Sequence, residues 1–401
     1  MELKAAKAVE PVYREAYGRA PEVIAWSPGR IEFLGNHTDY NGGEVLGATL
    51  NRGIAVAGGV GRPGLIRIRS DWKATEPVEL EWDGGELRPL SGEAGQGWAN
   101  FPLGVLEMMR RRGLSTRFGI DLALSSDLPV GAGLSSSAAL EVASSLAAGR
   151  VLGYDFSSTE DSIGIAKAAE HDFAGIPCGI LDQTVVVCGG RHRLVHLDCK
   201  TGGVRRIPLP EGFGMWIFNT AEQHSLLDSL YAERSRECRR ALEIVQGILP
   251  GVDALCELEE EGLEACREAL GERLWRRVRH VTGETERVRK ITALLEGKAA
   301  DGVGEAIGAA FFSSHESSRV NFENSTEHLD GVVGYLKEAE GVLGARLTGG
   351  GFGGAVLGLT GEGFGREEAE GVCREYARAF GQELEILEVA TGPGATVVEA
   401  G

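Results

Sequence analysis

The chain has 401 residues, 43% of them hydrophobic and 25% charged, which is ordinary globular composition and enough for two packed domains. Its formal net charge of −18 argues against nucleic acid as a partner, because binding to phosphates depends on clustered lysine and arginine. The seven cysteines are odd in number and lack CxxC spacing, which argues against a disulfide framework and a zinc site.

The N-terminal segment MELKAAKAVEPVYREAYGRA mixes acidic and basic residues and contains no apolar run. It therefore predicts neither a signal peptide nor a membrane span. We expect a cytoplasmic protein, a monomer or weak dimer, that acts on small molecules and binds neither membranes nor nucleic acid. Apolar residues at helical spacing predict a helix over residues 3–18.

After this helix, VIAWSPGRIEFLG is expected to form a strand, a turn and a second strand, followed by the loop HTDYNGG. The remainder of the first half predicts strands at GIAVAGGV, LIRIRS, VELEW, GIDLALSS, LVHLDCK and VRRIPLP. Helical patterns in this half cover 98–112, 135–153 and 159–174.

The second half begins with the predicted strand GMWIFNT and is dominated by helices, at 226–248, 252–270, 272–280, 283–296, 301–318 and 326–340. Strands return at ARLTGGG, AVLGLT and ELEILEVA. Because strands and helices do not alternate regularly, we predict an α+β fold with mixed or antiparallel sheets, in two lobes. The turn PLPEGFG puts the boundary between an N-terminal lobe, 1–211, and a C-terminal lobe, 212–401, with the active site in the cleft between them.

One glycine-rich stretch, LPVGAGLSSSAALEVASSLAAG, joins a flexible turn to a helix of small residues. Glycines let the backbone approach a ligand, and the free N–H groups at the start of a helix attract phosphate oxygens. The stretch is neither a Walker A loop nor a dinucleotide fingerprint. It predicts an anion site, and the alternative is a glycine turn followed by a serine cap.

Two further stretches have more polar or glycine residues than folding requires. SPGRIEFLGNHTDYNGG brings an arginine, a histidine and an aspartate into one loop, a combination that suits a ligand with many hydroxyls, although Asn, Asp and Gly also dominate ordinary turns. ARLTGGGFGGAVLGL interrupts a strand with five glycines, which predicts close approach by another backbone or a ligand, or else a bend or bulge.

Taken in order, these three stretches resemble the motifs of the GHMP kinase superfamily, and of the galactokinase family in particular. The segments WANF, EHDFAGIPCGILDQ, HSLLDSLY and SSHESSR are similar to galactokinase segments as well, so the resemblance covers nearly the whole chain. It implies a two-lobed kinase in which ATP and a sugar meet at the lobe interface. The expected reaction is phosphorylation of the anomeric hydroxyl of a galactose-like sugar.

The resemblance also implies roles for individual residues. Asp182 matches the aspartate near the anomeric hydroxyl and could accept its proton, and Arg30 matches the arginine beside it. Ser137 and Glu170 match the ligands of Mg²⁺. The positions expected to hold ATP are Trp98, Gly131, Gly133, Ser135, Ser136, Gly350 and Gly351. The alternatives are a surface aspartate with an ion pair at a strand end, a solvated helix face for Glu170 and core packing for Trp98.

For the sugar, the resemblance implies contacts from Asn36, His37, Asp39, Gly179, Asp182 and Tyr231. Asn36 departs from the family, which ordinarily has an acidic residue there that grips the hydroxyl on C6, and Glu32 stands where relatives usually have asparagine. The segment VNFENSTEHLD (320–330) also departs from the usual DDYEVSCPELD-like run.

These departures leave the substrate open at this point. Because an amide both donates and accepts, it could tolerate a carboxylate on C6, so galacturonate, arabinose or an amino sugar are alternatives to galactose. A catalytically silent sugar sensor is a further alternative. The intact GLSSSAA loop, Arg30 and Asp182 argue against the sensor.

Overall fold

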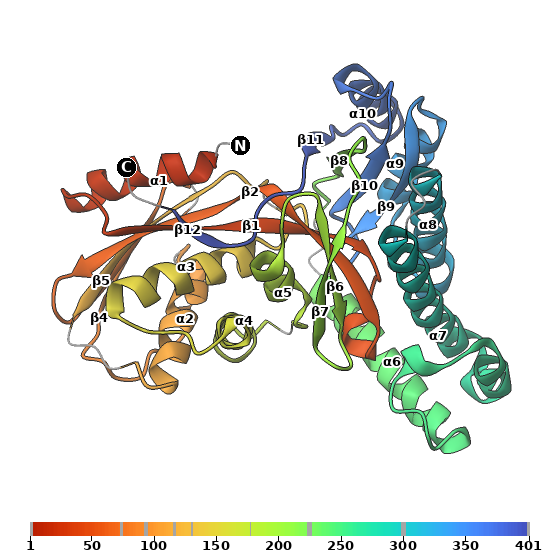
Figure 1. The fold of residues 1–401 in the computed structure, drawn as a ribbon, viewed down its shortest axis with the longest axis horizontal. Helices are drawn as coiled ribbons and strands as arrows, with labels where there is room; N and C mark the ends of the chain where they lie inside the picture. The colour runs from red at the N-terminus through yellow and green to blue at the C-terminus, as the bar shows by residue number, and fades with distance from the viewer. Residues whose placement is uncertain are drawn as a thin grey trace.

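The structure is a computed structural model that describes residues 3–72, 75–91, 95–114, 118–129, 131–176, 178–222, 227–297 and 302–398. Within these ranges the chain forms two β-sheets, each covered by helices, which lie side by side along the long axis of the molecule (Figure 1). One pair of strands in the first sheet is parallel and the other pairs are antiparallel. The predicted α+β class with mixed and antiparallel sheets is confirmed.

The first sheet has eight strands among the described residues, and six of them run in the order β12-β1-β2-β5-β3-β4. β6 also pairs with β2, and β7 with β6. Its strands are β1 (Val23–Leu34), β2 (Glu44–Gly61), β3 (Leu65–Ser70), β4 (Val78–Glu81), β5 (Gly119–Ser126), β6 (Arg193–Asp198), β7 (Gly203–Pro208) and β12 (Thr396–Val398). The helices of this half are α1 (Lys4–Tyr17), α2 (Asn100–Arg111), α3 (Ser136–Leu152), α4 (Thr159–Ala168) and α5 (Leu181–Cys188).

The predicted turn in VIAWSPGRIEFLG is wrong, because β1 is a single strand of 12 residues. It is irregular instead, with a register shift against β2 between Pro28 and Arg30. Proline is tolerated in a sheet at such a bulge, and bulges redirect the side chains that follow them. A Cβ on Gly29 would lie 2.9 Å from the carbonyl oxygen of Leu134, so the strand and the serine-rich loop approach closely here.

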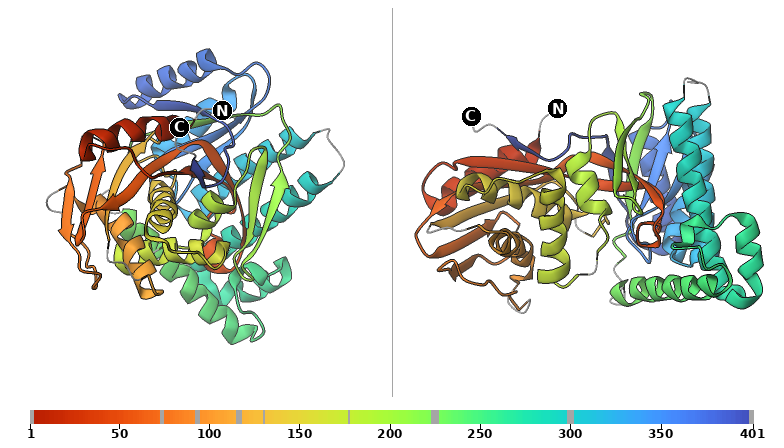
Figure 2. Two further views of the ribbon diagram at one scale, coloured as in Figure 1. Left: turned by 60° about the vertical axis from the view of Figure 1, so that its left-hand side comes forward. Right: turned by 60° about the horizontal axis from the view of Figure 1, so that its bottom comes forward.

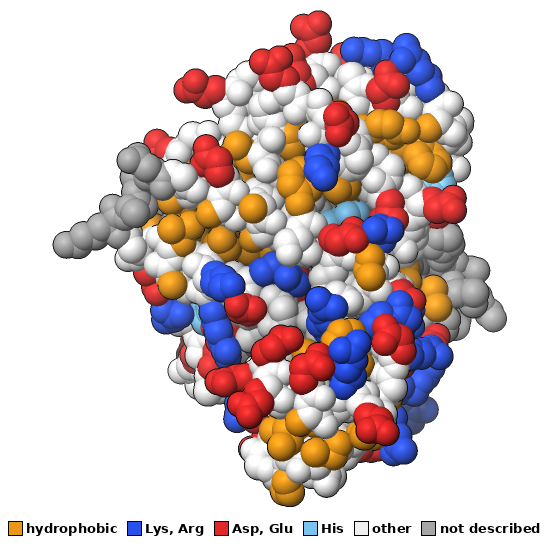
Figure 3. Space-filling model, turned by 90° about the vertical axis from the view of Figure 1, so that its right-hand side faces the viewer, with side chains coloured by type: hydrophobic (Ala, Val, Ile, Leu, Met, Phe, Trp, Pro, Cys, Tyr) orange, Lys and Arg blue, Asp and Glu red, His pale blue; other side chains and the backbone are white. Residues whose placement is uncertain are grey.

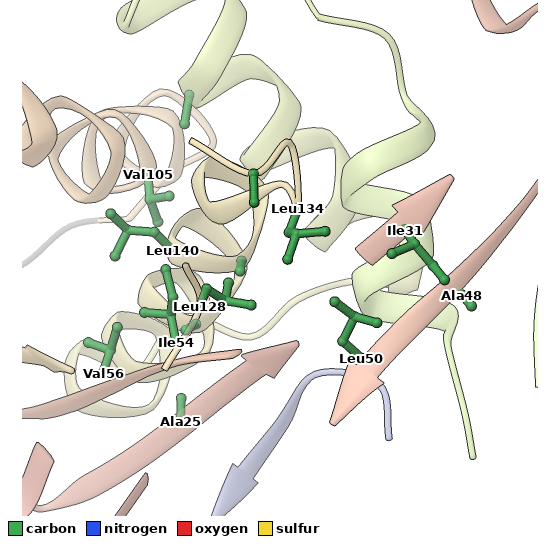
Figure 4. Packing of buried hydrophobic residues seen from close by; sticks show 14 of the residues in the cluster. Ala25, Ile31, Ala48, Leu50, Ile54, Val56, Val105, Leu128, Leu134 and Leu140 are labelled. Atoms are coloured by element: carbon green, nitrogen blue, oxygen red, sulfur yellow. The ribbon is translucent and has the colours of Figure 1, made fainter. Parts of the chain in front are cut away.

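Alternating residues of β1 are buried on opposite faces of the first sheet. Ile24 and Trp26 pack against α1, whereas Val23 and Ala25 belong to the largest apolar cluster on the side of α2 and α3. Figure 4 shows part of that cluster, in which leucines on either side of the serine-rich loop lie among residues of the sheet. The labelled residues are Ala25, Ile31, Ala48, Leu50, Ile54, Val56, Val105, Leu128, Leu134 and Leu140. The loop is therefore anchored at both ends in the core.

The second sheet is antiparallel, with the strand order β11-β8-β10-β9. Its strands are β8 (Gly214–Asn219), β9 (Val342–Thr348), β10 (Ala355–Thr360) and β11 (Glu385–Val389). The helices of this half are α6 (Leu227–Ile248), α7 (Glu260–Glu296), α8 (Val303–Ser317), α9 (Glu327–Glu338) and α10 (Arg366–Phe380). α9 and α10 share an apolar cluster with one face of the sheet, and buried residues of α8 belong to the cluster of the other face.

Most predicted helices are confirmed within a few residues, and three differences stand out. The patterns at 252–270, 272–280 and 283–296 merge into one long element, α7, which contains the left-handed Gly271 (φ 63°). The predicted start at 252 is wrong, because α7 begins at Glu260 and only a 3-10 turn, Leu255–Glu257, precedes it. α5 and α10 were not predicted from the sequence, and neither was β12. α6 and the N-terminal part of α7 form an apolar cluster of their own, away from the two sheets (Figure 2).

The chain passes from the first sheet to the second between Pro208 and Gly214, and β12 returns to pair with β1. The predicted boundary at 211 and 212 stays a prediction, and any division has to place residues 396–398 with the first sheet. Among the described residues, no helix combines the length and the apolar character that a membrane span needs.

Acidic and basic side chains are interspersed over the face where α7 and α8 lie (Figure 3). Many of them pair one helical turn apart, as in Arg267–Glu264 at 3.4 Å and Arg319–Glu316 at 2.8 Å. The predicted lack of nucleic-acid and membrane partners, the monomeric or weakly dimeric state and the cytoplasmic location stay predictions.

Candidate active site

Arg30 and Asp182 form a two-pronged ion pair although 152 residues separate them in the chain. Nε of Arg30 donates to Oδ1 of Asp182 at 2.8 Å, and Nη2 donates to Oδ2 at 2.7 Å. Arg30 follows the bulge in β1, and Asp182 lies in the first turn of α5. The structure thus brings together the two residues expected to be catalytic, and 28% of the aspartate side chain is exposed.

The serine-rich loop is bonded directly to this pair. The backbone N–H of Arg30 donates to the carbonyl oxygen of Leu134 at 3.1 Å, and Nη1 of Arg30 donates to that of Gly133 at 2.7 Å. Ser135 has left-handed backbone angles (φ 54°), and its hydroxyl donates to Asp182. It makes no cap bond to α3, so the predicted alternative of a serine cap is wrong. The first N–H groups of α3 are left for an anion.

The glycines of the third motif lie against the serine-rich loop. A Cβ on Gly349 would lie 3.5 Å from the carbonyl oxygen of Gly133, and a Cβ on Gly354 would lie 4.0 Å from that of Gly131. Gly131 and Gly133 have φ of 74° and 66°, a region that glycine adopts without strain. The predicted close approach of another backbone is confirmed.

A cavity of about 460 Å³ adjoins the serine-rich loop. Trp98 and Phe101 line it together with Ser136 and Ser137, the first residues of α3. An apolar, aromatic cavity next to a helix start suits a nucleotide, whose base can pack on the rings while its phosphates meet the loop. Trp98 therefore lies at a cavity wall rather than only in the core.

Glu170 lies in a π-helical turn (Ala169–Phe173) that follows α4, a feature frequent at functional sites. Nε2 of Gln183 donates to its Oε2 at 2.6 Å, and the Ser137 hydroxyl also bonds to its carboxylate. Burial and the nearby charge of Asp182 raise the pKa of Glu170. Glu170 is buried, so the alternative of a solvated helix face is wrong.

A second cavity, of about 200 Å³, brings together every residue expected to touch the sugar. Its lining includes Arg30, Glu32, Asn36, His37, Asp39, Gly179, Asp182, Tyr231, Gly349 and Gly350. Gly350 thus lies on this cavity rather than on the one beside Trp98, and a Cβ on Gly351 would lie 2.3 Å from the carbonyl oxygen of Asn324. The nucleotide contacts of Gly350 and Gly351 stay predictions. Of the similar segment HSLLDSLY, residues 224–226 lie outside the described residues.

His37 is fixed in one tautomer. Its Nε2 is 2.9 Å from the carbonyl oxygen of Gly350, which can only accept, so Nε2 carries the proton. Nδ1 then accepts from the hydroxyl of Tyr40 at 2.8 Å. Burial lowers the pKa of His37 to about 3, which keeps the ring neutral at physiological pH.

A residue that the sequence analysis did not identify binds the backbone of the loop that carries His37. Glu284 in α7 is fully buried and accepts from the backbone N–H groups of Gly35 at 3.1 Å and Asn36 at 3.0 Å. Although burial raises its pKa, the charge of Arg287 and its other partners lower it to about 2. A charged carboxylate thus fixes the position of the loop backbone.

Asp39 lies against Gly179 in the wall of the second cavity. A Cβ on Gly179 would lie 2.2 Å from Oδ2 of Asp39, so a side chain there would displace the Asp39 carboxyl group. Burial, and then the charges of Glu32 and Asp182, raise the pKa of Asp39 to about 7. The carboxyl group therefore changes its charge near neutral pH.

Asp39→Asn is expected to make the protein more stable at pH 8 than the unchanged chain. Between the ordinary aspartate pKa of about 4 and the folded value of about 7, the unfolded chain loses a proton that the folded chain keeps, so stability falls as pH rises through this window. Asparagine carries no titrating proton, so it avoids this loss of folding free energy, which is on the order of 2–4 kcal/mol at pH 8 and smaller at pH 5.

Urea unfolding at both pH values measures this difference, with the exposed Asp253→Asn as the control. Equal effects of Asp39→Asn at pH 5 and pH 8 would contradict the raised pKa.

Asn36 is completely buried, and its amide is saturated by the protein. Nδ2 donates to Oε1 of Glu32 at 2.9 Å and to the carbonyl oxygen of Gly349 at 2.7 Å. Oδ1 accepts from Nδ2 of Asn324 at 2.9 Å and from the hydroxyl of Ser318 at 3.4 Å. Two donors and two acceptor positions are thereby used, and a sugar contact from Asn36 stays a prediction.

Glu32 is held by a second residue that the sequence analysis missed, the buried Arg346 of β9. Nη2 of Arg346 donates to Oε1 of Glu32 at 2.9 Å, and Nη1 donates to the backbone oxygens of Glu32 and Phe33. An arginine inside the apolar strand pattern ARLT is the signal that could have identified it, because arginine is rarely buried without a partner.

Comparison with known proteins gives the family. The chain is 36% identical to the galactokinase of Thermotoga maritima over 372 residues, which covers 92% of this chain and 98% of that one. It is 34% identical to the galactokinase of Canis lupus familiaris, with 91% and 90% covered. The chain belongs to the galactokinase family. Family models match at residues 12–60 (galactokinase galactose-binding signature), 100–190 (GHMP kinases N terminal domain) and 291–382 (GHMP kinases C terminal).

Solved structures agree with this assignment. A Lactococcus lactis galactokinase in complex with galactose superposes with a TM-score of 0.88 at 27% identity, covering 97% of this chain and 99% of that one. The mevalonate kinase of Methanococcus jannaschii, at 14% identity and a TM-score of 0.65, shares the fold. This galactokinase-family chain is a kinase of the GHMP superfamily.

Proposed function

We propose that the chain transfers the γ-phosphoryl group of ATP to the anomeric hydroxyl of galactose and releases α-D-galactose 1-phosphate and ADP. One observation carries the proposal: the Arg30–Asp182 pair lines the small polar cavity and is also bonded to the serine-rich loop. An acceptor bound in that cavity lies beside the aspartate, and phosphates bound at the loop lie beside the arginine. Relatives named galactokinase, one of them in complex with galactose, support galactose as the acceptor.

In this proposal Asp182 orients the anomeric hydroxyl and accepts its proton as the oxygen bonds to the γ-phosphorus. The bond between that phosphorus and the β–γ bridging oxygen breaks, and ADP leaves with the electron pair. Arg30 holds the carboxylate in place through its two hydrogen bonds and stabilises charge on the transferred group. Because phosphoryl transfer depends chiefly on positioning and electrostatics, the two-pronged contact supplies most of what the protein contributes here.

Mg²⁺ fits the residues at the start of α3. Within the described ranges no group of three or more His, Cys, Asp or Glu side chains is arranged around a metal position. Mg²⁺ does not require one, because it takes one or two protein oxygens together with phosphates and water. Ser137 and Glu170 supply a hydroxyl and a carboxylate next to the nucleotide cavity. When bound, the ion neutralises phosphate charge.

Measuring ATP consumption with galactose, galacturonate, arabinose, N-acetylgalactosamine, glucose and mannose tests the proposal. We expect the highest kcat/KM for galactose, and loss of turnover with EDTA that Mg²⁺ restores. A different leading sugar would keep the mechanism and change the substrate. No turnover with any sugar would favour a sugar sensor.

A further inference from the structure

Glu32 offers the sugar cavity a carboxylate oxygen that the protein does not use. Its Oε1 accepts from both Asn36 and Arg346, each at 2.9 Å. Its Oε2 has no partner among the described residues and is not fully buried. It therefore opens onto the cavity that Glu32 lines. By contrast, both oxygens of Asp182 already accept from Arg30, and one also accepts from Ser135.

The hydrogen-bond partners of the Asn36 amide determine its orientation, and the amide in turn holds the Glu32 carboxylate in place. The two groups facing Nδ2 are the Glu32 carboxylate and the Gly349 carbonyl, which are both acceptors. If the amide were reversed, its oxygen would meet these two acceptors and its NH₂ would meet the NH₂ of Asn324, so all three contacts would be lost. Asn36 therefore presents no acceptor to the cavity.

Three departures from the family pattern thus meet at one point. Glu32 and Asn36 have exchanged the acidic and amide residues, and Asn324, from the atypical segment 320–330, binds the oxygen of the new amide at 2.9 Å. Nδ2 of Asn324 also donates to the carbonyl oxygen of Gly350 at 3.1 Å, which connects it to the cavity wall. The atypical segment therefore supports the exchanged pair.

We propose that Glu32 is the specificity-determining residue that accepts a hydrogen bond from one sugar hydroxyl, and that Asn36, Arg346 and Asn324 are positioning residues that aim its free oxygen. The proposal rests on the proposed function, whose sugar site it refines. A fixed anionic acceptor favours a neutral sugar that carries a hydroxyl at this point. It disfavours a uronic acid there, because two carboxylates would face each other in a small cavity.

A kinetic cycle with substrate analogues tests this role. kcat/KM is measured for the unchanged chain and for Glu32→Gln, with galactose and with its 2-, 3-, 4- and 6-deoxy analogues. We expect Glu32→Gln to lower kcat/KM for galactose about 10- to 100-fold, as for the loss of a hydrogen bond to a charged group. For the one analogue that lacks the bound hydroxyl, the substitution is expected to cost less than about threefold. A residue with a purely structural role would lower kcat/KM equally for all five sugars, and that result would overturn the proposal.

Glu107→Gln is the matched control. Glu107 is fully buried and bound by Arg110 and Arg111 at 2.8 and 2.9 Å, but it does not line the cavity. Its substitution removes the same kind of arginine-paired carboxylate, so it is expected to lower stability and to leave the ratios between the sugars unchanged.

A second measurement needs no variant and covers the case in which Glu32→Gln does not fold. The unchanged chain is expected to use at least one of the four deoxy analogues about 10-fold or more less well than galactose, because that analogue leaves the free carboxylate oxygen of Glu32 without a hydrogen-bond donor. Deoxy analogues that all react within threefold of galactose would overturn the assignment of Glu32 alone. Failure of the unchanged chain with every sugar would overturn the proposed function as well.

Discussion

Asp182→Asn is expected to lower kcat for galactose by about 10³-fold or more and to leave ATP binding intact. The substitution preserves volume but removes the charge that orients Arg30 and the oxygen that accepts the anomeric proton. The nucleotide cavity beside Trp98 does not include this side chain. Steady-state kinetics with galactose and a direct ATP titration separate the two effects.

The chain contains a control with the same geometry. Asp121 is bound by Arg67 through Nε at 2.8 Å and Nη2 at 2.7 Å, as Asp182 is by Arg30, and it lies on β5 outside both cavities. Asp121→Asn is expected to reduce stability with kcat within about threefold of the unchanged chain. Undiminished kcat in Asp182→Asn would refute the role of Asp182.

Arg30→Lys is expected to lower kcat about 10²-fold although the positive charge is kept. Lysine has no planar fork, so it cannot bind both oxygens of Asp182 and the Gly133 carbonyl at the same time. The aspartate and the serine-rich loop would then lose their common anchor, and the bound groups would no longer be aligned.

Arg67→Lys removes the equivalent fork on Asp121 and serves as the control. We expect kcat to change little in that variant. If both lysine variants retain full kcat, the loop and the aspartate are aligned by something other than the arginine fork.

Much of the fold could be predicted because its signals are local. Glycines in the three motifs mark left-handed turns and close backbone approach, and Gly131, Gly133 and Gly349 have positive φ in the structure. Helical spacing located most helices for the same reason. The SPG turn failed as a prediction because Pro28 and Gly29 are accommodated at a bulge inside β1.

Elements that depend on tertiary packing were missed. α5 contains three successive valines, which intrinsically favour strands, but Val185 and Leu181 pack in an apolar cluster with β6 and α4. This helix carries Asp182, so its position could not be derived from local pattern. β12 is only three residues long and exists because it pairs with β1.

The resemblance to the family identified the site residues, but it did not identify the residues that hold them in position. Arg346 binds Glu32 across 314 residues, and Asn324 binds Asn36 across 288. No spacing rule connects residues so far apart. The pattern ARLT indicates that Arg346 needs a partner but not which one, and Asn324 carries no such signal. The Asn36 amide has four hydrogen-bond partners, and three of them are more than 250 residues away in the sequence. Only the folded chain shows that this amide has no free position and that Glu32 does.

The measurement that tests the central claim most directly is the phosphorus and proton NMR spectrum of the product formed from galactose, ATP and Mg²⁺ by the unchanged chain. The proposed geometry predicts a single sugar phosphate with phosphorus coupled to the anomeric proton in the α configuration, formed in equal amount with ADP. Phosphate on any other carbon, or ADP without a sugar phosphate, would contradict the placement of the anomeric hydroxyl beside Asp182.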